Sequence, residues 1–387
     1  MLSTPWLWNS FALTIRPKYL KSDTMLAKTW LARAGKCPLI IRLGSQGNYQ
    51  SSMKPLMKVF LLHCEQWYSI HISVPLPVLE SLMPARSHLP RLQKLSLDVE
   101  PYEPLCIFKC APRLQWLKLT SDLDPSMVVA PWSQIEYFDT GRCNVDHCLK
   151  LLCATSNLKT CVIDLISSEP SQSHSSIQLL RLRPMTISGN PTHFFDTLLL
   201  PNLREISITQ SYWTATSQLT SLLSRCSLAK LSLTIGNLSD DDMIRVLQAC
   251  PSLVQLDLYY QRMSTFFLAQ FAYRRAPENS TTQQLAPMLH TMNITYRGTE
   301  FDIPDIADAI QSRIISNSKG LASDEITGLQ TVKICYKIAF HSPNLPTLSR
   351  LRQLKGTGWR LAFCWKEKIY FRHTRSIPNV MRHRVAR

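Results

Sequence analysis

The chain has 387 residues, of which 45% are hydrophobic and 18% are charged. This composition is typical of a globular protein and not of a disordered chain, and no apolar run approaches the ~18 residues that a membrane helix requires. The formal net charge of +16 is concentrated at the ends: residues 1–58 hold nine basic residues and one acid, and residues 350–387 hold eleven and one. The middle is close to neutral, so we expect solvated basic ends and not a nucleic-acid-binding surface.

The twelve cysteines indicate free thiols rather than a disulfide framework. Cys37, Cys110, Cys226 and Cys250 each come shortly before a predicted strand, and Cys161 occupies a position that leucine holds elsewhere. Buried thiols at such positions behave as small apolar residues. The N-terminus also lacks the basic region of a signal peptide. We therefore expect an intracellular protein, cytoplasmic or nuclear, with reduced cysteines.

The opening of the chain does not follow the pattern that comes later. Trp6, Leu7 and Trp8 are large apolar anchors within residues 1–15. Residues 16–88 then predict an irregular N-terminal cap of two opening repeats, each a helix followed by a strand. The expected order is helix, strand, helix, strand, over residues 25–35, 37–43, 56–64 and 67–74.

From Leu92 onward the chain repeats the pattern L-x-x-L-x-L, in which x is any residue. The apolar positions are Leu92/Leu95/Leu97, Leu114/Leu117/Leu119, Ile135/Phe138/Thr140, Leu158/Cys161/Ile163, Leu182/Met185/Ile187, Leu203/Ile206/Ile208, Leu228/Leu231/Leu233, Leu253/Leu256/Leu258, Leu289/Met292/Ile294 and Leu329/Val332/Ile334. Successive first positions lie 22, 21, 23, 24, 21, 25, 25, 36 and 40 residues apart. The first seven intervals match the ~20–29-residue period of leucine-rich repeats, and the last two require longer insertions or helices. Residues 89–349 therefore predict an α/β fold, a curved leucine-rich-repeat solenoid of parallel strands with outer helices.

Residues 238–260 are the clearest unit of this repeat. Ser239 is a natural N-cap, because its hydroxyl can accept from the free amides of a first helical turn. The acidic run 240–242 follows, at the positive end of the helix dipole, and apolar residues recur with helical spacing after it. Pro251 ends the helix, since the residue before a proline is pushed out of the α region. The strand of the unit is expected over 253–258.

Further helices are expected between the later strands. Apolar stripes predict helices over Asp146–Thr155, Thr192–Leu200, Thr216–Cys226, Met263–Arg275 and Ile303–Ser316. The asparagine that usually follows the apolar positions of this repeat is missing, so we expect an irregular solenoid. Residues 350–371 predict a C-terminal cap with a strand or hairpin after residue 359, and residues 372–387 a frayed basic tail.

Clusters that could carry chemistry are weak in this sequence. Cys143, His147, Cys148 and Cys153 lack paired Cys-x2-Cys spacing, and Cys148 and Cys153 do not share a helix face, which argues against zinc. The pair His63-Cys64 has no third, orienting group, and there is no phosphate-binding glycine motif. We expect no enzymatic activity, no metal and no cofactor.

The residues between the apolar strand positions are the better candidates for function. Side chains alternate between the two faces of a strand, so these residues face the concave side of a curved solenoid. The candidate protein-binding residues are Lys94, Asp98, Trp116, Lys118, Tyr137, Asp139, Glu205, Lys230, Asp257, Tyr259 and Asn293. A polar lining with aromatic side chains suits a protein partner, because aromatic residues anchor many interfaces. We expect a monomer that binds a protein substrate in this groove, with no membrane partner and with nucleic acid as a less favoured one.

Three segments resemble a known family. Leu2–Leu13 is similar to the motif LSTPxLWSSLxL, Trp30–Leu39 to WLxRSGxxPLxL, and His63–Trp67 to HSxRW. These are motifs of fungal (basidiomycete-type) F-box/leucine-rich-repeat proteins. The resemblance implies the substrate receptor of an SCF-type ubiquitin ligase.

The resemblance also places residues 1–15 at the end of the F-box and its junction. The family's adaptor-binding helices precede that junction, so we expect a chain that lacks most of its F-box. Either a longer form binds the SCF adaptor, or adaptor binding has been lost. Two alternatives to a ligase receptor stay open: an adaptor-independent leucine-rich-repeat scaffold, and RNA or anionic-surface binding through the basic ends.

Overall fold

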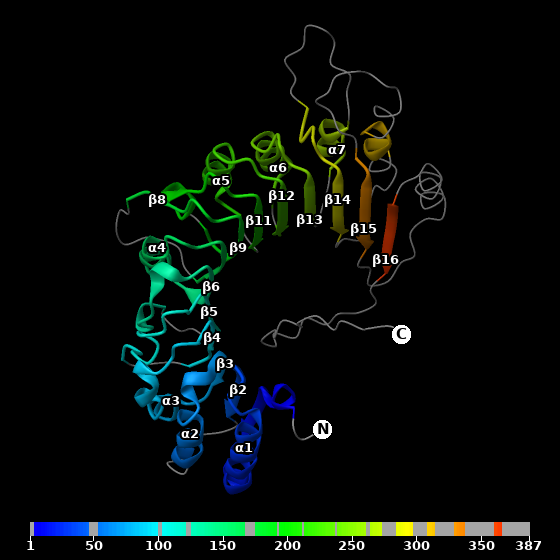
Figure 1. Ribbon diagram of the computed structural model, residues 1–387. Coiled ribbons are helices and arrows are strands. Elements are labelled where there is room, and N and C mark those ends of the chain that lie inside the picture. The colour runs from blue at the N-terminus through cyan, green and yellow to red at the C-terminus, as the bar shows by residue number, and fades with distance from the viewer. Residues whose placement is uncertain are drawn as a thin grey trace.

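The computed structural model describes residues 4–45, 53–99, 103–120, 125–166, 175–191, 193–210, 213–236, 238–260, 264–272, 284–296, 308–313, 329–336 and 360–365. These ranges form an arc (Figure 1). Strands line its inner side, and helices lie on its outer side. The predicted α/β class is confirmed, and the arrangement is solenoid-like.

One parallel sheet of 14 strands runs along the inner side of the arc. Its strands follow one another in chain order, and every neighbouring pair is parallel. They are β1 (Ser10–Ile15), β2 (Leu39–Ser45), β3 (Trp67–Ser73), β4 (Lys94–Leu97), β5 (Trp116–Leu119), β6 (Tyr137–Cys143), β7 (Thr160–Leu165), β9 (Pro184–Gly189), β11 (Glu205–Gln210), β12 (Lys230–Ile235), β13 (Gln255–Tyr260), β14 (Thr291–Tyr296), β15 (Thr331–Tyr336) and β16 (Arg360–Trp365). Parallel neighbours require a crossover after each strand, and these crossovers supply the outer layer.

The outer layer mixes α-helices with short 3-10 turns. The α-helices are α1 (Leu20–Ala34), α2 (Lys54–Leu61), α3 (Leu76–Glu80), α4 (Val145–Ala154), α5 (Thr216–Leu223), α6 (Asp240–Gln248) and α7 (Thr265–Phe271), and residues 308–313 are also helical. The 3-10 turns include η1 (Pro5–Trp8), η4 (Cys64–Gln66), η5 (Met83–Ser87), η7 (Trp132–Gln134) and η8 (Phe195–Thr197). A second, two-stranded sheet joins β8 (Ile177–Gln178) to β10 (Leu198–Leu199).

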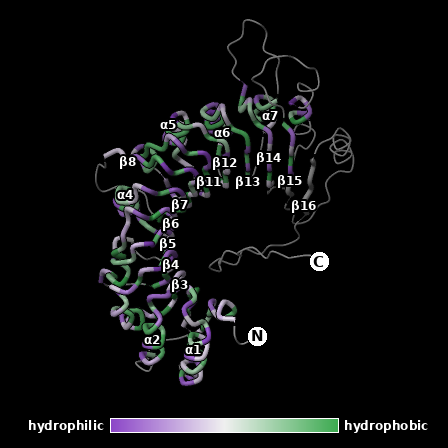
Figure 2. Tube along the Cα trace, in the orientation of Figure 1, coloured by the Kyte–Doolittle hydropathy of each residue, from purple (hydrophilic) through white to green (hydrophobic). Residues whose placement is uncertain are grey.

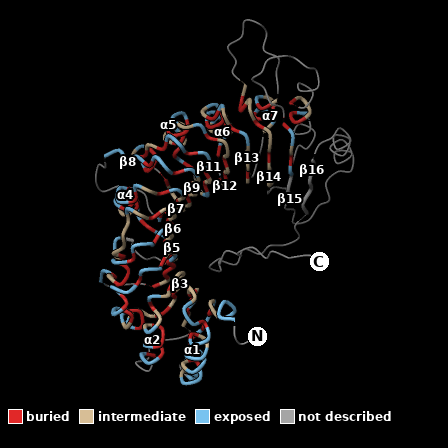
Figure 3. Tube along the Cα trace, viewed as in Figure 1, coloured by how far each residue is buried: buried red, intermediate tan, exposed pale blue. Residues whose placement is uncertain are grey.

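The repeated apolar positions form the core. Every member of the ten triplets whose burial is described is at most 3% exposed. Buried segments gather where strands and outer helices face each other (Figure 3), and hydrophilic and hydrophobic residues alternate along the arc (Figure 2). Burying a side chain such as Leu stabilises the fold by roughly 1.5–3 kcal/mol. The face of each strand that carries these apolar residues therefore packs against the outer layer.

The unit at 238–260 forms as the sequence predicts. The Ser239 hydroxyl accepts a hydrogen bond from the backbone N–H of Asp242 at 3.1 Å and donates to the Asp242 carboxylate at 2.7 Å. Helix α6 begins at Asp240 and ends at Gln248, with Met243, Val246 and Leu247 buried. Strand β13 then pairs with β12 and β14.

One predicted helix is wrong. Within the helix expected at 192–200, residues 193–200 do not form an α-helix: His193 has a left-handed φ of 64°, Phe195–Thr197 make a 3-10 turn, and Leu198–Leu199 form β10. Leu198 and Leu200 are both buried, a spacing of two that fits an extended chain and not a helical stripe. The other predicted helices are present where the structure describes them, with shifted ends.

The sheet begins within the segment 1–15 that the resemblance places at an F-box junction. Residues 10–15 form β1, the first strand of the sheet that also contains the repeats. Of the predicted C-terminal cap the structure describes only β16, and residues 372–387 lie outside the described ranges. Among the described residues, no helix is both long and apolar enough to cross a bilayer.

A buried arginine links the helical segment 308–313 to the end of α7 and to residues 285–286 by hydrogen bonds. Arg313 is 4% exposed and donates to the carbonyls of Phe271, Leu285 and Ala286. Its guanidinium also lies 3.9 Å from the centroid of the Phe271 ring. Burial lowers the pKa of Arg313 to about 10, which leaves it protonated at neutral pH.

Candidate recognition surface

All eleven predicted residues lie on one face of the sheet. Each alternates with buried core residues along its strand, or directly follows such a strand as Asp98 does. This face is the concave face of the arc, because the helices occupy the other side (Figure 1). The structure therefore places the predicted residues as the alternation rule requires, although it separates them into two groups.

The first group is centred on an aromatic pair. Trp116 in β5 and Tyr137 in β6 are register partners, and their rings stack with centroids 4.8 Å apart and planes 10° apart. Burial, with smaller contributions from Asp139 and Cys161, raises the pKa of Tyr137 to about 12. The phenol therefore keeps its proton at neutral pH and remains a hydrogen-bond donor.

An ion pair lies in the next row of the same strands. Lys118 Nζ donates to Asp139 Oδ2 at 2.6 Å. The two side chains are 25% and 12% exposed, so water screens this pair less than a pair on an open surface. Asp139 Oδ1 also accepts from the backbone N–H of Gly141 at 3.4 Å. These contacts fix the carboxylate beside the aromatic pair.

Thr140 holds a core position that is occupied by apolar residues in the other triplets, and it lies at an irregularity of β6. The pairing of β6 with β7 shifts register between Asp139 and Arg142. Thr140 is fully buried, and its hydroxyl donates to the carbonyl of Gly141 at 2.6 Å while accepting from the N–H of Asp164 at 3.3 Å. The buried hydroxyl is thus satisfied, as a polar group in a core must be.

The second group is centred on a carboxylate in β13. Asp257 accepts from Gln255 Nε2 at 3.0 and 3.1 Å and from Asn293 Nδ2 at 2.5 Å. Tyr259 follows on the same face. Two amides therefore hold this carboxylate, with no ion pair to it among the described residues.

The sequence missed two residues at the N-terminal side of the surface. Arg42 in β2 and His71 in β3 are register partners, and His71 is in turn aligned with Ser96 and then Lys118. His71 Nδ1 and Ser96 Oγ share a hydrogen bond of 2.8 Å. Both residues alternate with core isoleucines and leucines in the opening repeats, so the same period-two rule finds them when it is applied there.

Small hydroxyl side chains separate the two groups. Along β9, β11 and β12, one row holds Thr186, Ser207 and Ser232, and the next holds Ser188, Thr209 and Thr234. Glu205 and Lys230, at the edge of this stretch, are register partners but form no ion pair in the part of the chain that the structure describes. Between the Trp116 group and the Asp257 group, the concave face is therefore lined mainly by small polar side chains.

The cysteine and histidine residues singled out in the sequence differ in their burial. Cys148 is buried and Cys153 exposed, which confirms that they do not share a face. Burial raises the pKa of Cys64 and lowers the pKa of His63, which disfavours the thiolate and imidazolium of a catalytic pair. Among the described residues, no three His, Cys, Asp or Glu side chains are grouped as metal ligands.

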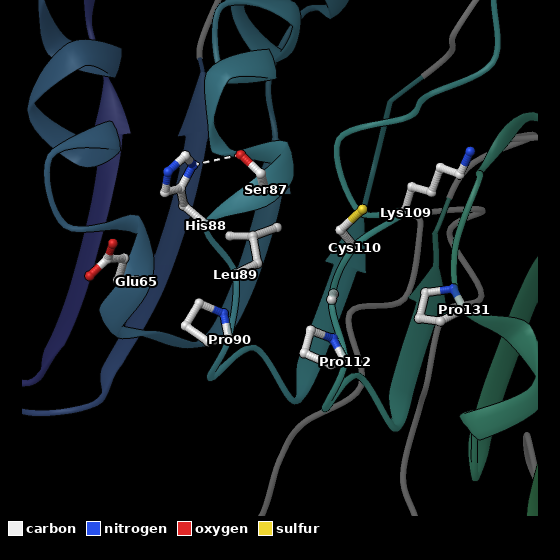
Figure 4. A pocket seen from close by; sticks show the side chains of 10 residues that line it. Glu65, Ser87, His88, Leu89, Pro90, Lys109, Cys110, Pro112 and Pro131 are labelled. Carbon is white, nitrogen blue, oxygen red and sulfur yellow. Dashed lines mark hydrogen bonds between the residues drawn. The ribbon is translucent and has the colours of Figure 1, made fainter.

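A hollow of about 460 Å³ lies outside the concave face. It is lined by turns that precede β3, β4, β5 and β6, with Glu65, His88, Lys109 and Pro131 among its residues (Figure 4). Two of its lining residues share a hydrogen bond of 2.9 Å, between Ser87 Oγ and His88 Nδ1. The hollow shares no residue with the predicted surface.

No known family model matches this chain, and no curated protein sequence matches it.

Proposed function

We propose that this chain is a non-catalytic recognition module that binds a protein partner on the concave face of a leucine-rich-repeat solenoid. The observation that carries the proposal is the Trp116–Tyr137 stack beside the half-buried Lys118–Asp139 pair. Aromatic side chains beside fixed charges are typical of the residues that dominate binding energy in protein interfaces. A stacked pair is also already ordered, so less conformational entropy is lost on binding.

Two features support the assignment of the repeat type. The apolar triplets recur with the period of leucine-rich repeats for seven intervals, and each contributes one parallel strand in chain order. In a solenoid of this kind each unit contacts its neighbours only, and the strands form an extended concave surface. Such a surface suits a large partner better than a small substrate.

The family resemblance supports a role in ubiquitin ligation. The segment from Trp30 onward contributes to an aromatic cluster, since Trp30 meets Trp8 with ring centroids 4.7 Å apart. Gly35 ends α1 with a φ of 59°, and Trp67 is 1% exposed. These motif residues thus have structural roles in the opening units, as expected for a family that shares this fold. The partner bound in the groove would then be the substrate of an SCF-type ligase.

The test is affinity purification of the tagged chain followed by mass spectrometry. The double variant Trp116→Ala/Tyr137→Ala should reduce recovery of a groove-bound partner by roughly tenfold or more, as loss of hot-spot residues does. Phe266→Ala is the matched control, because this aromatic residue is 52% exposed on helix α7. Equal recovery with both variants would contradict binding in the groove.

The same purification separates the ligase role from its alternatives. Recovery of an SCF adaptor and cullin supports a substrate receptor, whereas a partner recovered without them supports an adaptor-independent scaffold. Binding that collapses between low salt and ~200 mM salt would instead indicate phosphate contacts by the basic ends.

A further inference from the structure

The concave face over β2, β3 and β4 carries two cations without ion-pair partners. Arg42 and Lys94 are both exposed, and neither forms an ion pair among the described residues. By contrast, Lys118 in the adjacent strand is paired with Asp139. We name Arg42, Ser69, His71, Lys94 and Ser96 the Arg42–Lys94 cluster.

The pairing of the strands brings this cluster together. Arg42 is aligned with His71 in β3, Ser69 with Lys94, and His71 with Ser96 in β4. Arg42 and Lys94 are two strands apart, so about 10 Å separates their strands. The two long side chains can meet over the middle strand β3, which contributes the hydroxyl group of Ser69 and the ring of His71. An anionic group placed there would receive charged and neutral hydrogen bonds together.

The charge around the cluster limits what it can bind. Three cations face this part of the groove (Arg42, Lys94 and Lys118), and two carboxylates lie beside them (Asp98 and Asp139). The surplus is a single positive charge. Consistent with a net positive field, the pKa of His71 is lowered, first by burial and then by Arg42 and Lys118, against the opposing effect of Asp98.

We propose that the Arg42–Lys94 cluster binds one glutamate or aspartate side chain of the protein partner, so that this part of the groove selects a segment with a single acidic residue. This inference rests on the proposed function and specifies which part of the partner lies over β2–β4. A single carboxylate matches the single surplus charge. An RNA strand fits less well, because successive phosphates would approach Asp98 and Asp139, and strand binding requires a longer run of cations.

The test uses an amidated glycine peptide with one central glutamate and a water-soluble carbodiimide, which joins a carboxylate to a lysine amine in contact with it. Tryptic mapping then compares Lys94 with Lys28 and Lys150, which are exposed on α1 and α4 outside the groove. We expect the peptide to label Lys94 above both controls. Arg42→Gln should reduce labelling of Lys94 roughly two- to fivefold, the effect of losing one exposed charge contact. Arg86→Gln, an equal charge change at an exposed site in η5, should not.

Several outcomes would overturn the inference. Equal labelling of the three lysines, or no effect of Arg42→Gln, would show that the cluster does not select carboxylates. Stronger competition by a phosphoserine peptide or by oligouridylate than by the glutamate peptide would assign the cluster to phosphate or to RNA.

The inference and the proposed function can fail separately. Loss of selective labelling, with partner recovery still dependent on Trp116 and Tyr137, would refute only the acidic-segment inference. Selective labelling with recovery independent of these two residues would refute the groove as the site of partner binding.

Discussion

Trp116 and Tyr137 stack face to face across two neighbouring strands, with ring centroids 4.8 Å apart. The contact requires residues 21 positions apart in sequence to be opposite each other, and the β5–β6 register provides this alignment. Stacked aromatic pairs contribute about 0.5–1.5 kcal/mol beyond the area that they bury. The pair therefore links the stability of these units to the geometry of the proposed binding surface.

A double-mutant cycle measures this link. Trp116→Ala, Tyr137→Ala and the double variant should give a coupling of about 0.5–1.5 kcal/mol in the free energy of unfolding. Urea unfolding followed by circular dichroism supplies the three differences. Strictly additive effects would show that the rings do not stabilise each other in solution.

Gly189 should not tolerate a side chain. Its φ is +85°, and an added Cβ would lie 1.9 Å from the carbonyl oxygen of Leu165 on the neighbouring strand. Gly189→Ala should thus lower the free energy of unfolding by at least about 2 kcal/mol, since left-handed backbone alone costs an alanine about 1–2 kcal/mol.

Gly44→Ala is the matched control for that substitution. Gly44 also lies in a strand of the sheet, but an added Cβ would meet nothing within 4 Å. Its effect on thermal unfolding should be small. A similar loss for both variants would mean that the clash at Gly189 is relieved at little cost.

Ser239 caps helix α6 through its hydroxyl. Ser239→Ala should lower the free energy of unfolding by about 1 kcal/mol, and Ser239→Gly by less, as at other helix N-caps. Thermal or urea unfolding of the three proteins checks this order. A larger loss for glycine than for alanine would be inconsistent with a capping role.

The pKa of His71 should lie below its ordinary value of 6.5, because burial and the charges of Arg42 and Lys118 disfavour the imidazolium. Its contribution to stability is therefore present above pH 6.5 and falls as the pH drops below that value. Arg42→Gln should raise the pKa of His71, and Arg86→Gln should leave it unchanged. An NMR titration of the ring protons measures both shifts, and an unchanged pKa in Arg42→Gln would argue against a charge contact.

The sequence predicts the sheet well because the apolar residues of each repeat are the residues that the structure buries. Each L-x-x-L-x-L segment has only one way to turn its large apolar side chains toward the core, so the strands of the large sheet from β4 to β15 could be placed. Helix α6 was equally predictable, since Ser239 caps its start and Pro251 limits how far it can extend. The helix expected at 192–200 was wrong because the spacing of apolar residues does not reveal the left-handed backbone conformation of His193.

Strand β1 was missed although its signal was present. Phe11, Leu13 and Ile15 are buried and alternate with exposed residues, which is the period of a strand. The same alternation continues in β2 and β3, where it places Arg42 and His71 on the concave face.

The contacts within the surface could not be predicted from the sequence. Alternation tells which face a residue occupies, but not which residues of neighbouring strands meet. The pairing of the strands aligns the apolar triplets whatever the length of the crossover, and so places Lys118 opposite Asp139 and Asp257 opposite Asn293. Which side-chain rotamers then complete the ion pair and the hydrogen bond is not contained in the repeat pattern.

The central claim is that a protein partner lies against the concave face, and site-specific photocrosslinking tests it most directly. Benzoylphenylalanine replaces Trp116 in one variant and Phe266, on the outer helix α7, in another. The account predicts a crosslinked partner protein from position 116 and none from position 266. Crosslinking from position 266 alone, or equally from both, would contradict it.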